Sequence, residues 1–259
     1  MLNKTSLLIL GIIVFMAAVA YAAPIGAFLT ADAPEKKPTT PAGTNGAGAG
    51  NVTYVNLTGE SVTLSWQGYY GEVSGVITLD NANNYTLYNW TVTNAKGEVY
   101  AANETVTWTN VQCFNFTAAG TFADDSGNAG GTSKFGMSLA QLELSYNLSA
   151  TDVDGVNETF RLIGASTHDS FFTGPLSFNE GECRNTRILS QGSGVGQNDK
   201  FEEVLLYDPD GKMPVFASIL EQNLAGFDTA AHDFEMLVLE KGRQGNTLAT
   251  TYYFYVELE

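Results

Sequence analysis

The sequence predicts an all-β protein: a mainly antiparallel β-sandwich with one short helix, preceded by an N-terminal signal or anchor helix and a flexible tether. After residue 51, apolar residues recur at every second position over several short runs, which is typical of half-buried strands. Gly and Asn interrupt these runs at roughly ten-residue spacing, as in sandwiches and barrels. The chain has 259 residues, 44% of them hydrophobic, and is long enough to bury a sizeable core.

The N-terminus has the composition of an export signal. Lys4 is the only charged residue among the first 31, and residues 6–29 are uncharged and mostly apolar. Small residues at Ala20 and Ala22 fit a secretory signal peptide that is cut after Ala22. A retained membrane anchor is the alternative, because this 24-residue stretch is long enough to span a bilayer. With either alternative for residues 1–22, we expect the rest of the chain to be extracellular or at the cell surface. The protein would contact a membrane only through this segment, and only if the segment is retained.

Residues 23–50 are expected to form a flexible tether. The part from residue 31 onward is rich in Pro, Gly and Thr and offers nothing that could bury a core. One β-sandwich domain would then cover residues 51–259, with a division into subdomains 51–159 and 160–259 as the alternative.

The first predicted strands follow the tether. Val62, Leu64 and Trp66 alternate with Ser and Thr, so they share the buried face of one strand. Thr86, Tyr88, Trp90 and Val92 share one face of a later strand in the same way. A strand is also predicted over residues 73–79, with turns over 68–71, 81–84 and 94–97.

The C-terminus gives the clearest strand. Residues 251–259 alternate strictly, and a strand carrying four aromatic residues is expected to be paired inside a sheet. Residues 234–239 are predicted as its neighbour, with a turn over 241–246. One face of the C-terminal strand holds Tyr252, Phe254, Val256 and Leu258, and the other holds Tyr253, Tyr255, Glu257 and Glu259.

One segment favours a helix. Phe216, Ile219, Leu220 and Leu224 recur at helical spacing. Pro214 suits a first turn and Gly226 suits a C-cap, so a short helix is predicted between them.

The composition excludes several function classes. Asp and Glu number 28 against 12 Lys and Arg, and the net charge of −16 argues against binding to nucleic acid or to an anionic membrane surface. Two Cys and two His are too few for a Cys- or His-rich metal centre.

Cys113 and Cys183 are the only cysteines. In an exported chain such a pair most simply forms a disulfide, with two buried thiols as the alternative.

Eight Asn-x-Ser/Thr triplets between residues 51 and 159 predict an N-glycosylated face on the first part of the domain. They begin at Asn51, Asn56, Asn84, Asn89, Asn103, Asn115, Asn147 and Asn157.

Candidate catalytic residues are few. His168 and His232 each precede an Asp, and Ser166 lies two residues before His168. A hydrolase would need such a hydroxyl as nucleophile and a His as base, but no G-x-S-x-G motif accompanies them. The simpler interpretation is two His hydrogen-bonded at loop or strand ends, so no enzymatic activity is expected.

Two ligand sites are conceivable. Asp152, Asp154 and Asn157 resemble part of an oxygen-donor calcium loop, although the terminal Glu of an EF-hand is missing and such a sequence is also an ordinary turn. A calcium ion there would be structural, and no other cofactor is expected. Tyr69 and Tyr70, flanked by Gly, are the best exposed candidates for stacking on a glycan, with core packing as the alternative for the neighbouring aromatics.

Two stretches carry a family resemblance. Residues 66–75 with Ile-Thr-Leu at 77–79, and residues 227–236 with the closing strand, resemble uncharacterised exported β-sandwich proteins of the archaeal cell surface. The resemblance covers most of the chain after the tether. It implies a location and an archaeal lineage, and it implies no catalytic residues, because the family has no assigned activity.

These observations predict a non-enzymatic structural or interaction protein of the cell surface, such as a subunit of an extracellular filament or envelope layer. Self-association would use residues 51–58 as a strand donated to a neighbour's sheet. A secreted glycan- or peptide-binding module is the alternative, followed by a secreted hydrolase.

Overall fold

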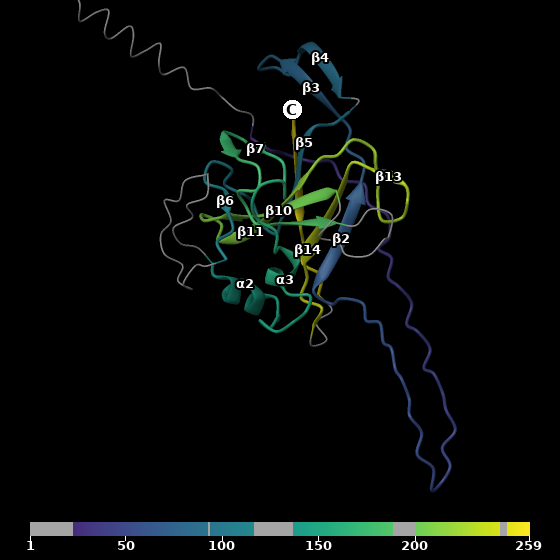
Figure 1. The fold of residues 1–259 in the computed structure, drawn as a ribbon. Helices are drawn as coiled ribbons and strands as arrows, with labels where there is room; N and C mark the ends of the chain where they lie inside the picture. Colours follow the sequence, from purple (N-terminus) through teal and green to yellow (C-terminus); the bar gives the residue numbers. More distant parts are fainter. Residues whose placement is uncertain (1–22, 93, 117–136, 189–199, 244–247) are drawn as a thin grey trace, which may run out of the picture.

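The computed structural model describes residues 23–92, 94–116, 137–188, 200–243 and 248–259 (Figure 1). The predicted signal or anchor segment, residues 1–22, lies outside the described residues. The described chain is mostly antiparallel β-structure with two short helices, which confirms the predicted fold class.

A seven-stranded antiparallel sheet forms the centre of the fold. Its order is β1-β15-β5-β11-β10-β6, and β9 also pairs with β10. The strands are β1 Ile25–Gly26, β5 Gly97–Ala102, β6 Gln112–Cys113, β9 Asn185–Ile188, β10 Phe201–Asp208, β11 Met213–Ile219 and β15 Tyr253–Leu258.

One face of this sheet packs against a second, two-stranded sheet and the helices. The covering elements are β2 Trp66–Gly71, β14 Phe234–Leu239, α2 Leu139–Ser145 and α3 Val156–Thr159. Leu205 and Phe216 of the central sheet meet Met236 and Val238 of β14, and Leu142 comes from α2. This sandwich core is the larger of two hydrophobic clusters among the described residues.

The other face is covered by the hairpin of β7 Phe171–Thr173 and β8 Leu176–Phe178. Tyr100, Val204 and Val215 pack there with Phe171 and Phe178. The Cys113–Cys183 disulfide belongs to the same cluster, with 5.1 Å between its Cα atoms, so the predicted bond is confirmed. Because both faces of the central strands are covered, all residues of β5 and β10 are buried.

The helix predicted between Pro214 and Gly226 is wrong. The first half of that segment belongs to strand β11, and β12 Leu224–Ala225 then pairs with β13 Ala231–His232. A strand covered on both faces carries a continuous apolar run, and such a run also contains apolar residues three and four positions apart, as a buried helix does. The first helix instead begins after Ser138, whose side chain forms a reciprocal capping box with Gln141.

The other strand predictions are confirmed in part. β3 Gly75–Asp80 and β4 Thr86–Val92 form the expected hairpin, but the turn predicted over residues 68–71 lies inside β2. The strand face predicted for Val62, Leu64 and Trp66 is wrong, because β2 begins only at Trp66, and Val62 and Leu64 are exposed. Strands β14 and β15 exist as predicted yet are not neighbours, because β14 pairs with β2 and β15 pairs with β5 and β1. Ile25 and Gly26, placed in the tether by the prediction, form β1 at the edge of the central sheet.

Candidate functional site

A long exposed arm separates β1 from the rest of the fold. It comprises residues 28–62, beginning after Ala27, whose N–H donates to the carbonyl of Phe254 at 3.0 Å. Every residue of the arm is exposed, and none of them forms a hydrogen bond to a described residue outside the arm. Figure 1 shows the arm running away from the body and returning to it at β2. The arm is therefore covered by nothing in the described chain.

The arm contains a stretch of strand-like composition that pairs with no strand among the described residues. Val52, Tyr54, Val55 and Leu57 have exposed fractions between 53% and 102%. The sequence from residue 38 to residue 59 carries no charged side chain. Large apolar side chains and unpaired backbone N–H and C=O groups in one segment form a template for pairing with another chain.

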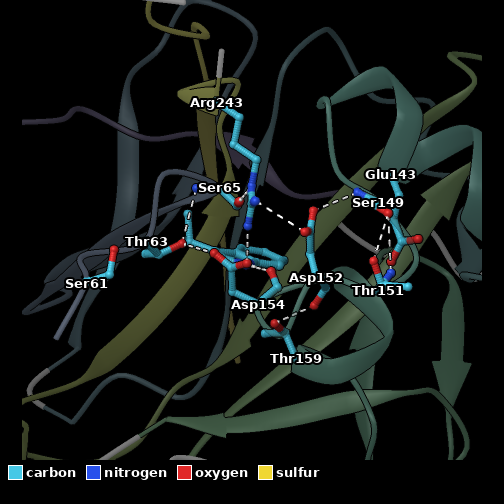
Figure 2. A network of polar contacts seen from close by, with 12 residues as sticks. Ser61, Thr63, Ser65, Glu143, Ser149, Thr151, Asp152, Asp154, Thr159 and Arg243 are labelled. Carbon is cyan, nitrogen blue, oxygen red and sulfur yellow. Dashed lines mark hydrogen bonds and ion pairs between the residues drawn. The ribbon is translucent and has the colours of Figure 1, made fainter. Parts of the chain in front are cut away.

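The C-terminal root of the arm is held by a polar network (Figure 2). The Thr63 hydroxyl donates to the Asp154 carboxylate at 2.6 Å, and the Trp66 indole N–H donates to the Asp154 carbonyl at 2.7 Å. The Arg243 guanidinium binds the carboxylates of Asp152 and Asp154, and its Nε donates to the Ser65 hydroxyl at 2.9 Å. The arm is thus fixed at Thr63 and exposed before it.

The same network shows where the predicted calcium ligands lie. Asp152 and Asp154 do come together, but around the guanidinium of Arg243, which supplies the positive charge that the prediction gave to calcium. Asn157 contacts other partners, accepting a hydrogen bond from Arg184 at 3.2 Å and donating one to Glu158. The described residues contain no group of three or more His, Cys, Asp or Glu side chains placed to hold a metal.

Replacing Arg243 with Ala is expected to lower the free energy of unfolding by about 2 kcal/mol, because charged hydrogen bonds are lost and two carboxylates are left facing each other. Urea denaturation measures this change. The matched control is Arg161→Ala, which removes an exposed guanidinium elsewhere. Equal stability of the two variants would contradict the role of Arg243, and recovery of the Arg243→Ala variant by added calcium would show that a cation can replace the guanidinium.

A second exposed apolar feature is the hairpin of β3 and β4. Its register places Ile77 opposite Trp90 and Leu79 opposite Tyr88, so these four side chains share one face. Their exposed fractions lie between 39% and 58%, and the rings of Tyr88 and Trp90 are 4.7 Å apart. We call this the apolar hairpin face. In Figure 1 the hairpin projects from the body at the opposite end from the arm.

The predicted glycosylation sites differ in exposure. Asn51 and Asn56 lie in the arm, Asn84 and Asn89 in the hairpin, and Asn147 after α2; all five are exposed. Asn103, Asn115 and Asn157 are half-buried, and the side-chain oxygen of Asn103 is enclosed. Glycosylation stays a prediction, and exposure favours the first five sites.

Both histidines have structural hydrogen bonds. The fully buried His168 ring accepts the Cys183 N–H at Nε2, 3.1 Å away, so its Nδ1–H donates to the Asp169 carbonyl at 2.7 Å. Neither ring nitrogen is directed at Ser166, whose N–H donates to Glu180. The hydrolase arrangement considered from the sequence is therefore not assembled around His168.

His232 lies at a corner between β13 and β14. Its Nε2 contacts the Asp228 carboxylate at 2.9 Å, and the ring lies 4.8 Å from Tyr70. The next residue, Asp233, accepts the N–H groups of Val73 and Asn223 at 2.8 and 3.1 Å. These contacts tie three chain segments together.

The two predicted glycan-stacking tyrosines point to opposite sides of β2. Tyr69 packs into the sandwich core, with its ring 5.0 Å from that of Phe254. Tyr70 is exposed and makes an edge-on contact with Phe227, 4.8 Å away. The structure therefore does not bring the pair together in one platform.

A group of buried carboxyls lies among residues that the sequence did not mark as functional. Glu98 and Glu257 face each other across β5 and β15, and the Tyr100 hydroxyl lies 3.4 Å from both. Burial, followed by the charges of Glu259 and Glu257, raises the pKa of Glu98 to about 9. Burial likewise raises the pKa of Glu203, a fully enclosed residue of β10.

Comparisons with known proteins add no relative: no family model, curated protein or solved structure matches the chain. None of the helices in the described part of the chain has the length and apolar character needed to cross a bilayer.

Proposed function

We propose that the protein is a non-enzymatic, N-glycosylated structural subunit of the cell surface or extracellular space. It self-associates by donating residues 51–58 to the sheet of a neighbouring copy, in a filament or envelope layer. The observation that carries the proposal is the arm itself, in which strand-forming apolar residues are exposed and have no pairing strand in the described part of the chain. Strand addition satisfies the backbone groups and buries the side chains in one step.

The rest of the described fold is consistent with a structural role. The disulfide suits an oxidising compartment. The hydrogen bonds of His168 and His232 give each histidine a structural role, so no catalytic role is needed to explain them. The polar network around Arg243 fixes the root of the arm to the body, so that tension along a polymer would be passed to the sandwich.

Placing charges in the donated strand tests the proposal. The double substitution Val55→Asp and Leu57→Asp is expected to abolish polymer, because buried unpaired charges are costly. Electron microscopy and sedimentation of the full chain measure assembly, and thermal unfolding checks that the fold is retained.

The matched control is Thr39→Asp with Thr40→Asp, which adds the same charge to the exposed arm outside the strand. Polymer formed by the Val55/Leu57 variant at the control's level would rule out donation of residues 51–58.

A further inference from the structure

The apolar hairpin face is an extension of the sandwich core that lacks its cover. Val92, the last residue of β4, shares this face with Tyr88 and Trp90 and packs against the core, as does Val73 before β3. Beyond this root the face is open, and no third strand pairs with the hairpin in the described chain. An isolated two-stranded hairpin is only marginally stable in water, so a third strand would add both hydrogen bonds and burial.

The opposite face of the hairpin is more polar. Val76, Thr78, Asn89 and Thr91 lie there, on the side turned away from Ile77 and Trp90, and Val76 is 50% exposed. Asn89 begins a predicted glycosylation site, and Asn84 begins another at the hairpin turn. Sugars at these positions would keep one face solvated and leave the apolar hairpin face open for contact.

The arm matches this two-sided arrangement. Val55 and Leu57 are two residues apart, so in an extended strand they point to one side, and Val52, Tyr54 and Asn56 point to the other. A strand with Val55 and Leu57 on the apolar hairpin face therefore carries Asn56 on the same side as Asn89. Asn51 lies on the same side as Val55 and Leu57, so this register requires that Asn51 carries no sugar or lies beyond the end of the hairpin.

Charge also favours a meeting of these two segments. The chain carries a net charge of −16, so copies repel one another over most of their surface. Residues 38–59 carry no charge, and Asp80 is the only charged residue in 73–92. A contact between the arm of one copy and the hairpin of another therefore meets less electrostatic repulsion than a contact between other parts of two copies.

The arm leaves its own hairpin uncovered, because none of its residues forms a hydrogen bond to a described residue outside the arm. It is fixed at Thr63, and Leu57 lies six residues earlier, which spans at most about 20 Å of extended chain. The hairpin begins beyond the far end of β2, a strand of six residues that is itself about 20 Å long. Leu57 therefore reaches no further than the root of its own hairpin, and residues 51–56 would have to extend along it. Folding of the arm onto its own hairpin would leave the chain a monomer, so sedimentation distinguishes it from donation of the strand to a second copy.

We propose that the apolar hairpin face, with a free edge of β3 or β4, is the acceptor for residues 51–58 of a second copy. This inference rests on the proposed function and names the site that the donated strand fills. The donor and the acceptor lie at opposite ends of the molecule (Figure 1), so each copy can receive one arm and offer another. Such a head-to-tail contact does not close on itself and generates a filament.

Two full-chain variants test the proposal by complementation. Val55→Asp with Leu57→Asp destroys the donor, and Ile77→Asp with Leu79→Asp destroys the acceptor while leaving the donor intact. Each variant alone is expected to sediment as a monomer. Their mixture is expected to form a one-to-one dimer of twice the monomer mass and no filament, because one donor and one acceptor remain.

The acceptor control is Val76→Asp with Thr78→Asp, which places the same charges on the opposite face of the same strand and should leave filaments intact. Filaments formed by the Ile77/Leu79 variant would overturn the acceptor assignment while the proposed function stood. Loss of filaments in the control variant as well, or failure of the two monomeric variants to dimerise, would also overturn it. A wild-type chain that stays monomeric would contradict the proposed function itself.

Discussion

Between pH 4.5 and pH 9 the folded protein is expected to become less stable as the pH rises. Glu98 is almost fully buried, and its pKa is raised from 4.5 to about 9 by burial and by the charges of Glu259 and Glu257. Burial also raises the pKa of Glu203, against the N–H of Leu237, and burial with the charges of neighbouring acids raises that of Glu221 to about 7.

The sign follows from proton linkage. Below pH 4.5 these carboxyls are protonated in both the folded and the unfolded chain, so the stability is fully present. Above it the unfolded chain loses protons that the folded chain keeps until the pH passes the folded pKa, and the free energy of unfolding falls throughout this window. For Glu98 the shift corresponds to on the order of 5 kcal/mol. Glu60 and Asp228 have lowered pKa values and act the other way, but both are exposed and screened by solvent.

Urea denaturation at pH 4.5, 7 and 9 measures this dependence. Glu98→Gln should raise stability at pH 9, change it little at pH 4.5 and so flatten the profile. Glu104→Gln, at an exposed position, is the matched control. A wild-type stability that is constant or rises towards pH 9, or equal profiles for the two variants, would contradict the assignment of Glu98.

Removing the disulfide is expected to lower the free energy of unfolding by about 4 kcal/mol, the value of the chain-entropy model for a loop of this length. Cys113 lies in edge strand β6 and Cys183 is fully buried before β9, and 70 residues separate them. The bond therefore restricts the unfolded chain over much of the domain. The measurement is urea denaturation of the Cys113→Ser, Cys183→Ser double variant.

A loss below 1 kcal/mol would contradict this account, because it would mean that the unfolded chain gains little freedom when the link is cut. Wild-type protein unfolded with a reductant present is the second measurement, since it removes the bond without changing the sequence. Both should show the same loss.

Period-two patterns made the outer elements predictable from the sequence. β15 alternates clearly because the neighbours on its two sides differ: Phe254 packs in the sandwich core, whereas Tyr255 packs against the cluster on the other side. β4 alternates as well, although all of its residues except Val92 are exposed. Strand β11 was not predictable in this way. Apolar groups cover both of its faces, so the alternation is absent and helical spacing arose by coincidence.

The sequence could predict only those parts of the candidate site that depend on neighbouring residues in the chain. Residues 51–58 have strand composition, and the structure adds that they are exposed and pair with no other described strand. The role of Arg243 depends on contacts with Asp152 and Asp154, about ninety positions earlier, and nothing in the local sequence signals such a contact. The apolar hairpin face needed the exact register of β3 and β4, which sequence spacing alone does not give.

Electron microscopy of the native protein, recovered from cell envelopes or culture medium, tests the central claim most directly. Intact-mass analysis of the same sample would establish whether residues 1–22 are removed and how many sugars are attached. We predict regular filaments or a lattice in which density for residues 51–58 of one copy lies against residues 75–92 of the next. Dispersed monomers at the native surface concentration would contradict a structural subunit that assembles by strand donation.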